Sequence, residues 1–77
     1  MNVIEMPSSQ SDLASIIERK PGLLTVAQLK GLIAFGKTAI YDMVDAGEIP
    51  YLRIKSSIRF DPIVIARWLR ERTVVAA

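Results

Sequence analysis

The sequence predicts a small, mostly α-helical fold that includes one β-hairpin. Three segments space their apolar residues at i, i+3 and i+4, and a fourth does so at i, i+3 and i+7, which are patterns of a helix with one buried face. Residues 49–60 instead alternate apolar and polar side chains with a period of two, which predicts two short strands. The chain has 77 residues, of which 51% are hydrophobic, so it has room for one domain. We therefore expect three core helices, a hairpin and a short N-terminal helix.

Residues 1–22 are predicted to form a flexible N-terminal arm that contains the short helix. No periodicity is sustained over residues 1–10. Residues 12–20 carry an apolar stripe at helical spacing, but a helix of this length is marginal on its own. The stripe consists of Leu13, Ile16 and Ile17. It must therefore pack against the main domain or against another chain.

Two helices joined by a tight turn are predicted over residues 25–47. The first follows Thr25, whose hydroxyl can cap it, and lasts two to three turns. The second runs from Lys37 to about Ala46 and stops before Gly47, the residue best suited to a left-handed C-terminal cap. The connection is Ala34, Phe35 and Gly36.

The second of these helices has one apolar face and one polar face. Ile40, Met43 and Val44 lie at i, i+3 and i+4, and we expect them to face the core. The opposite side carries Lys37, Thr38, Tyr41, Asp42 and Asp45. That side is predicted to be exposed, and it is polar with one aromatic ring.

The period-two segment predicts a hairpin that turns around Lys55, Ser56 and Ser57. One face would carry Leu52, Ile54, Ile58 and Phe60. Arg53 and Arg59 would share the other face, and symmetric pairing about Ser56 would set them opposite each other. Two like charges placed in this way repel each other unless an anion lies between them.

The last helix is predicted to begin at Pro62, with Asp61 as an acidic N-cap. Its buried stripe would consist of Ile65, Trp68 and Leu69. Its exposed side would carry Arg67, Arg70 and Arg72 as solvated side chains. We expect the domain to span residues 23–72 and residues 73–77 to form a frayed tail.

Composition disfavours an enzyme. The chain has no cysteine and no histidine, which removes disulfides, thiolate zinc ligands, thiol nucleophiles and the commonest general acid or base. We predict no catalytic residue, no cofactor and no metal site. No apolar run approaches the ~18 residues of a membrane span, and the N-terminus lacks a basic region followed by an apolar one. We therefore expect a cytoplasmic protein with no membrane partner.

The positive charge is concentrated in the second half of the chain. The net charge is only +2, but residues 53–72 hold six basic and two acidic side chains. A basic balance favours a polyanionic partner when the charge is clustered in this way. Nucleic acid is therefore the partner that charge alone favours.

The order helix, turn, helix, hairpin, helix is the plan of a winged helix-turn-helix. In five places the residues resemble excisionase and MerR-type DNA-binding domains. These are residues 24–26, 37–41, 47–50, 58–62 and 68–69, that is LTV, KTAIY, GEIP, IRFDP and WL. The resemblance covers about residues 23–72. It implies a bacterial or phage-type protein that acts on DNA, either as a recombination directionality factor or as a small transcriptional regulator.

The resemblance also implies how double-stranded DNA would be bound. The second helix would enter the major groove, and the hairpin would meet the flanking minor groove or backbone. The implied DNA-binding residues are Lys37, Thr38, Tyr41, Arg53, Lys55 and Arg59. Lys37 would meet a phosphate, Thr38 a base edge or thymine methyl, and Tyr41 a phosphate or the bases.

Two features leave other partners open. Asp42 and Asp45 would repel phosphates, so their half of the helix would tilt away from the backbone, read cytosine amino groups or face a protein. The alternative function is therefore a protein-interaction module of the same fold, with a recombinase or a replication or regulatory protein as partner. Apolar residues that the predicted core does not require also predict self-association. These residues are Leu13, Ile16, Ile17, Ile63 and Val64.

Overall fold

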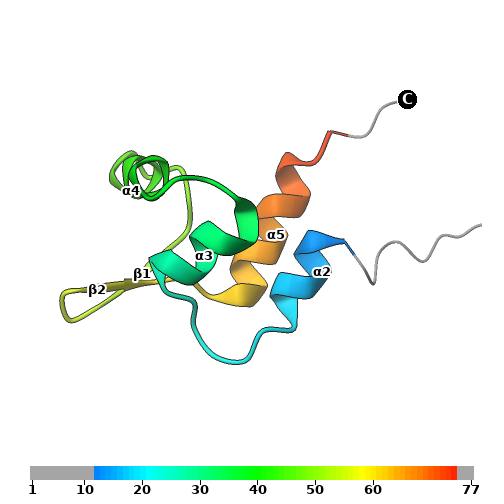
Figure 1. Ribbon diagram of the computed structural model, residues 1–77, viewed down its shortest axis with the longest axis horizontal. Helices are drawn as coiled ribbons and strands as arrows, with labels where there is room; N and C mark the ends of the chain where they lie inside the picture. Colours follow the sequence, from blue (N-terminus) through cyan, green and yellow to red (C-terminus); the bar gives the residue numbers. More distant parts are fainter. Residues whose placement is uncertain (1–11, 75–77) are drawn as a thin grey trace, which may run out of the picture.

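The computed structural model describes residues 12–74 and contains four helices and one antiparallel hairpin in that range (Figure 1). The elements are α2 (Leu13–Glu18), α3 (Val26–Ile33), α4 (Lys37–Asp45), β1 (Leu52–Ile54), β2 (Ser57–Arg59) and α5 (Pro62–Arg72). The predicted winged helix-turn-helix fold is confirmed. Residues 1–11 and 75–77, which include half of the predicted arm and most of the predicted tail, lie outside the described residues. Among the helices of residues 12–74, none combines the length and apolar character that a membrane crossing requires.

Side chains cap three of the four helix N-termini in the described part of the chain. The Asp12 carboxylate accepts the Ser15 backbone N–H at 2.9 Å ahead of α2. The Thr25 hydroxyl accepts the Gln28 N–H at 3.1 Å, and the Gln28 side chain accepts the Thr25 N–H at 2.8 Å in return. Asp61 caps α5 through a bond of 2.9 Å. Each cap satisfies an amide that the helix leaves unpaired, which explains why these helices begin where the sequence predicts.

The two helices of the helix-turn-helix end in different ways. α4 ends in a Schellman motif around Gly47, whose φ is 71°, so the predicted left-handed cap is confirmed. In this motif the Glu48 N–H donates to the Met43 carbonyl at 2.8 Å. The C-cap of α3 is Ala34, which adopts a left-handed conformation with φ 60° although it carries a Cβ atom. The turn between α3 and α4 therefore stores backbone strain that the turn after α4 avoids.

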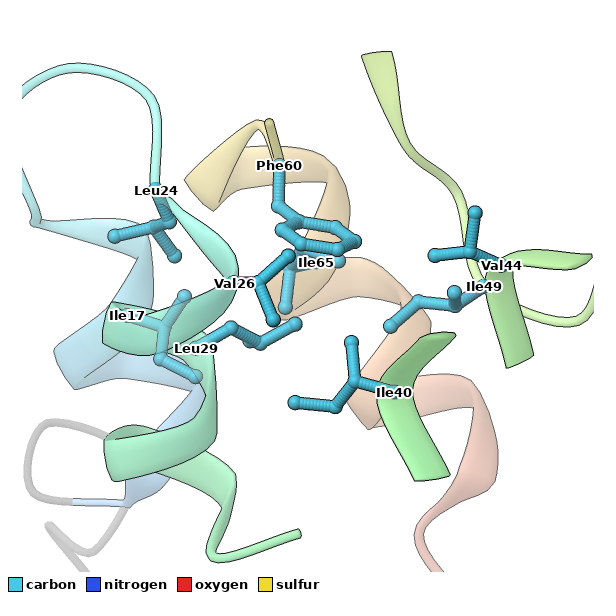
Figure 2. Packing of buried hydrophobic residues seen from close by; sticks show 9 residues of the cluster. All are labelled: Ile17, Leu24, Val26, Leu29, Ile40, Val44, Ile49, Phe60 and Ile65. Carbon is cyan, nitrogen blue, oxygen red and sulfur yellow. The ribbon is translucent and has the colours of Figure 1, made fainter. Parts of the chain in front are cut away.

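The core lies where the helices meet the base of the hairpin (Figure 2). Its fully enclosed side chains are Phe60, Ile17, Leu29, Ile40 and Ile65. Leu24, Val26, Val44 and Ile49 complete the buried cluster, and Met43, Trp68 and Leu69 pack against it while partly exposed. Every described helix thus contributes at least one buried residue, as a chain with so small a core requires.

α2 packs against α5 and contributes to this core. Ile17 has no exposed surface. Arg70 of α5 forms an ion pair with Glu18 at 2.7 Å and donates to the Ser15 hydroxyl at 3.3 Å. The prediction that Ile17 takes part in self-association is therefore wrong, because the helix turns Ile17 into the core and leaves its neighbour Ile16 outside, 38% exposed. The core thus includes a residue that precedes residue 23, where the domain is predicted to begin.

The hairpin has a different register from the predicted one. Leu52 pairs with Arg59, and Arg53 pairs with Ile58, so the turn contains two residues rather than three. Paired residues lie on the same face of a hairpin, and Arg53 and Arg59 therefore lie on opposite faces. The prediction that they face each other is wrong. Lys55 takes a φ of 57° to close the shorter turn, and the repulsion between two opposed arginines is avoided.

The hairpin is joined to the start of α3 by a further backbone bridge. Leu24 and Phe60 exchange two hydrogen bonds, of 2.8 and 2.9 Å. Because Phe60 follows β2 directly, this bridge sets the Thr25 end of α3 beside β2. The helix-turn-helix and the wing are therefore neighbours along one side of the molecule.

Candidate nucleic-acid interface

A groove lies between the N-terminal turns of α3 and α4 and the hairpin. Lys37 and Tyr41 line it from α4, and Arg59 lines it from β2. The remaining lining residues are Thr25, Val26, Ala27, Ser56, Ser57 and Ile58. The fold therefore brings two cations and a phenol, from segments about 20 residues apart, to one depression edged by hydroxyl groups. This set of donors is the kind that holds phosphate oxygens.

The rotation of α4 about its axis follows from its buried residues. Ile40 and Val44 are 0% and 3% exposed, and they turn one side of the helix into the core. Lys37 and Tyr41, one turn apart, fall on the side toward the hairpin, and the Tyr41 ring is 42% exposed. Thr38, Asp42 and Asp45 are exposed as well. The predicted polar face of α4 is therefore open to solvent along its whole length.

The N-terminus of α4 differs from those of the other helices in residues 12–74. Gly36 is its N-cap and offers no side-chain hydrogen bond. The first amides of a helix have no partner within that helix, so those of α4 are left to solvent or to a ligand. They lie in the turn that carries Lys37, and the helix dipole adds to its positive charge there.

Arg59 is held at the edge of the groove. Its Nη1 donates to the carbonyl oxygen of Ile58, its own neighbour, at 2.8 Å. The side chain is half-buried, and one hydrogen bond fixes its direction while other guanidinium N–H groups remain to donate. It is thus partly ordered before any anion arrives.

The other two predicted wing cations are placed differently. Arg53 is exposed on the opposite face of the hairpin, with its guanidinium carbon 5.9 Å from the centre of the Tyr51 ring. Lys55 is exposed at the tip of the turn. Of the six predicted DNA-binding residues, Lys37, Tyr41 and Arg59 therefore line the groove, while Thr38 and Lys55 flank it. Arg53 lies apart.

Acidic side chains make the exposed face of α4 electrically asymmetric. Lys37 stands at its N-terminal end, and Asp42 and Asp45 stand in its second half. The exposed face of α4 is therefore positive at its N-terminal end and negative in its second half. Within residues 12–74, no group of three or more His, Cys, Asp or Glu side chains is arranged to hold a metal ion.

Some residues of this region could not be found from sequence patterns. Thr25 and Ala27 line the groove only because the Leu24–Phe60 bridge brings α3 to the hairpin, and no local pattern signals that bridge. Phe35, in the turn ahead of α4, is 52% exposed. The sequence offers one signal for the exposure of Phe35, which is that a large apolar residue in a tight turn has no core to pack against.

Comparisons with known proteins give one finding on the family. A family model described as a helix-turn-helix domain matches residues 23–73. This segment is more than half of the chain and includes α3, α4, the hairpin and α5. Neither the comparison with curated proteins nor that with solved structures gives a significant match.

Proposed function

Because this chain belongs to the helix-turn-helix domain family, a family of DNA-binding domains that are typically not enzymes, we propose that it binds double-stranded DNA sequence-specifically. α4 lies in the major groove, and the hairpin meets the adjoining minor groove or backbone. The observation that carries this proposal is the common groove of Lys37, Tyr41 and Arg59. A single duplex bound over this groove contacts α4, which is the proposed recognition helix, and the hairpin, which is the wing, at the same time.

The roles of the α4 residues follow from their positions. Lys37 and the uncapped amides beside it hold a phosphate at the rim of the major groove. Thr38, exposed in the same turn, contacts a base edge or a thymine methyl. Tyr41, one turn further on, donates its hydroxyl to a phosphate or lays its ring against sugar and base. Together they fix the helix in one register on the duplex.

Asp42 and Asp45 are compatible with this arrangement if they face the floor of the major groove. Phosphates line the rims of the groove, whereas the floor presents the amino groups of cytosine and adenine. A carboxylate there accepts a hydrogen bond from cytosine N4 and disfavours guanine, whose edge carries acceptors. We therefore expect the preferred site to contain cytosine under the second half of α4.

The wing contributes mainly through Arg59 and Lys55. Arg59 lines the groove beside α4, and Lys55 extends beyond it at the tip of the turn. Arginine and lysine at such positions bind backbone phosphates or the narrow, electronegative minor groove. Arg53 faces away from Arg59 and reaches only the outer backbone, so its contribution is the smallest of the three.

The cellular role that we propose is that of an excisionase-like recombination directionality factor or a small transcriptional regulator. Both act through short DNA sites, and one domain of this size contacts few base pairs. Self-association on adjacent sites would raise the affinity through effective concentration. Exposed apolar side chains support it, namely Leu13, Ile16 and Ile63, which are 38%, 38% and 57% exposed, with the half-buried Val64. Sedimentation of the free protein over a range of concentrations, and of the protein on DNA with one site and with several sites, tests this step. A monomer mass at every concentration, together with several sites that fill independently of one another, contradicts it.

A second candidate is a protein-interaction module of the same fold. It is favoured by the outward Asp42 and Asp45, which could meet a basic partner such as a recombinase. Salt dependence separates the two functions. Binding of DNA through phosphates weakens steeply with salt, with about one unit of log-log slope for each phosphate bound. An interaction module shows only weak duplex binding, typical of any slightly basic protein.

Selection from a random duplex pool tests the main proposal directly. We expect the recovered duplexes to share one short sequence. Thr38→Ala should reduce the preference for that sequence by about 1–3 kcal/mol for each hydrogen bond to a base that it removes, with little effect on a mixed-sequence duplex. Val74→Ala, at a 92% exposed position that does not line the groove, removes side-chain atoms without changing the charge and is the matched control. A recovered pool with no shared sequence contradicts the proposal.

A further inference from the structure

One residue between α4 and the hairpin is hydrogen-bonded to two different helices. The Glu48 N–H donates to the Met43 carbonyl of α4 at 2.8 Å. The Glu48 carbonyl accepts two bonds from α5, from Trp68 Nε1 at 2.9 Å and from Arg72 Nη2 at 3.3 Å. Hydrogen bonds of the Glu48 backbone therefore attach the C-terminal end of α4 to α5, and we call this attachment the Glu48 joint.

The two donors on α5 hold each other in place. The Arg72 guanidinium carbon lies 4.4 Å from the centre of the Trp68 ring, which is the geometry of a cation–π contact. Arg72 Nη1 also donates to the Trp68 carbonyl at 3.5 Å. Because the ring is stacked under the guanidinium and half-buried against the core, both N–H groups converge on one carbonyl oxygen.

This joint stands at the point that sets the relation between α4 and the wing. Glu48 is followed by Ile49, 2% exposed, and by Pro50, after which β1 begins at Leu52. A shift of the Glu48 peptide therefore moves the C-terminal end of α4 relative to the hairpin. Neither Trp68 nor Arg72 lines the groove of Lys37, Tyr41 and Arg59.

We propose that Trp68 and Arg72 are positioning residues for DNA recognition, which act through the Glu48 carbonyl. They fix the angle between α4 and the hairpin so that Lys37 and Tyr41 reach the major groove while Arg59 reaches the flanking backbone. The inference rests on the proposed DNA-binding function. Sequence-specific binding needs this angle because base contacts require α4 and the wing to be engaged together. Non-specific binding depends on charge and tolerates a change of angle.

Two substitutions separate positioning from packing and charge. Trp68→Phe keeps an aromatic ring and removes the indole N–H, and Arg72→Lys keeps the charge and removes the planar, multi-donor group. Ile17→Val, on the α2 side of the core, is a control for loss of stability alone. Glu48→Gln is a control for the side chain, because it leaves the carbonyl in place.

The measurement is the affinity for the duplex recovered by selection and for a mixed-sequence duplex, at several salt concentrations and well below the melting temperature. For Trp68→Phe and Arg72→Lys we expect the ratio of the two affinities to fall roughly tenfold, within what one hydrogen bond supports. The mixed-sequence affinity and its salt slope should stay unchanged. Ile17→Val and Glu48→Gln should keep the wild-type ratio.

The outcomes distinguish the two proposals. If the wild-type protein discriminates between the duplexes and both α5 variants discriminate equally well, Trp68 and Arg72 only stabilise the fold and the positioning role is overturned. The same conclusion follows if Ile17→Val lowers the ratio to the same extent. If the wild-type protein does not discriminate at all, the proposed function fails, and the positioning role fails with it.

Discussion

The two sides of the molecule are built in different ways. On the right of Figure 1, α2 and α5 pack side by side and are joined by the buried Ile17 and by the bonds from Arg70 to Glu18 and Ser15. α4 and the hairpin lie on the left of Figure 1. Their side chains line a shared groove. The comparison teaches that α2 is held by contacts that lie away from the candidate interface, although the core also includes Ile40 and Val44 of α4. Substitutions in α2 and substitutions of groove residues should therefore separate stability from binding.

The largest expected effect is on the α2–α5 side. Ile17→Ala removes most of a fully buried side chain and should lower the free energy of unfolding by about 2–5 kcal/mol. For a domain of this size, such a loss is comparable to its whole stability. Urea unfolding followed by circular dichroism measures it. Ile16→Ala, at the adjacent and 38% exposed position, is the control and should cost well under half as much. Equal losses would show that α2 does not bury Ile17 as described.

The next effect is on the opposite side and concerns binding. Arg59→Ala should weaken binding to all duplexes alike and reduce the log-log salt slope by about one unit, because it removes one phosphate contact. Arg53→Ala removes the same charge from the other face of the hairpin and should change the slope less. Titration of a labelled duplex at several salt concentrations measures both. A larger effect for Arg53 would reverse the side of the wing that we assign to DNA.

The predictable part of this fold is the part that depends on neighbours in sequence. Thr25, Asp61 and Gly47 mark helix ends by local chemistry, and each acts as the sequence predicts. The hairpin register could not be predicted in the same way. A turn without glycine gives no sign that Lys55 will take a positive φ, and a one-residue change of register turns every side chain of β2 to the other face relative to β1.

The candidate site shows the same limit. Lys37 and Tyr41 could be placed from the apolar stripe of α4, because that stripe fixes which side of the helix is exposed. The attachment of Glu48 to Trp68 joins residues 20 positions apart and has no local pattern. The helical spacing predicts that Trp68 packs near the core. It does not predict that the indole N–H donates to the Glu48 carbonyl, because that acceptor is placed by the end of α4.

A smaller effect on the free energy of unfolding tests the backbone strain at Ala34, in the turn between α3 and α4. Ala34→Gly should raise the free energy of unfolding by about 1 kcal/mol, because glycine adopts φ 60° without steric cost. Gly47→Ala is the mirror experiment and should lower it by a similar amount. A Cβ atom at Gly47 would meet no atom within 4 Å, so the cost there is conformational. Thermal unfolding measures both, and a destabilising Ala34→Gly would contradict the strain.

The smallest effect is a pH dependence on the α2 side. The backbone N–H of Ser15, followed by its side chain, holds the pKa of Asp12 below its ordinary value of 3.8. The folded state therefore binds a proton at the Asp12 carboxylate less readily than the unfolded state does. The cap contributes stability at pH values above 3.8, and this contribution is lost as the pH falls below 3.8. Asp12→Asn keeps a capping oxygen that does not titrate, so its unfolding curves should change less between pH 5 and about pH 3. Identical pH profiles would contradict the assignment.

Because the turn of the hairpin has two residues, the number of residues between Arg53 and Arg59 determines whether their side chains lie on the same face. If Ser56 were deleted and the turn kept its length, Ile54 would pair with Ile58, and Arg53 would come to lie opposite Arg59. Both guanidinium groups would then project from one side, with no change in composition beyond a single serine. The number of residues between Arg53 and Arg59, more than the number of arginines, therefore governs how much positive charge the wing can direct toward a ligand.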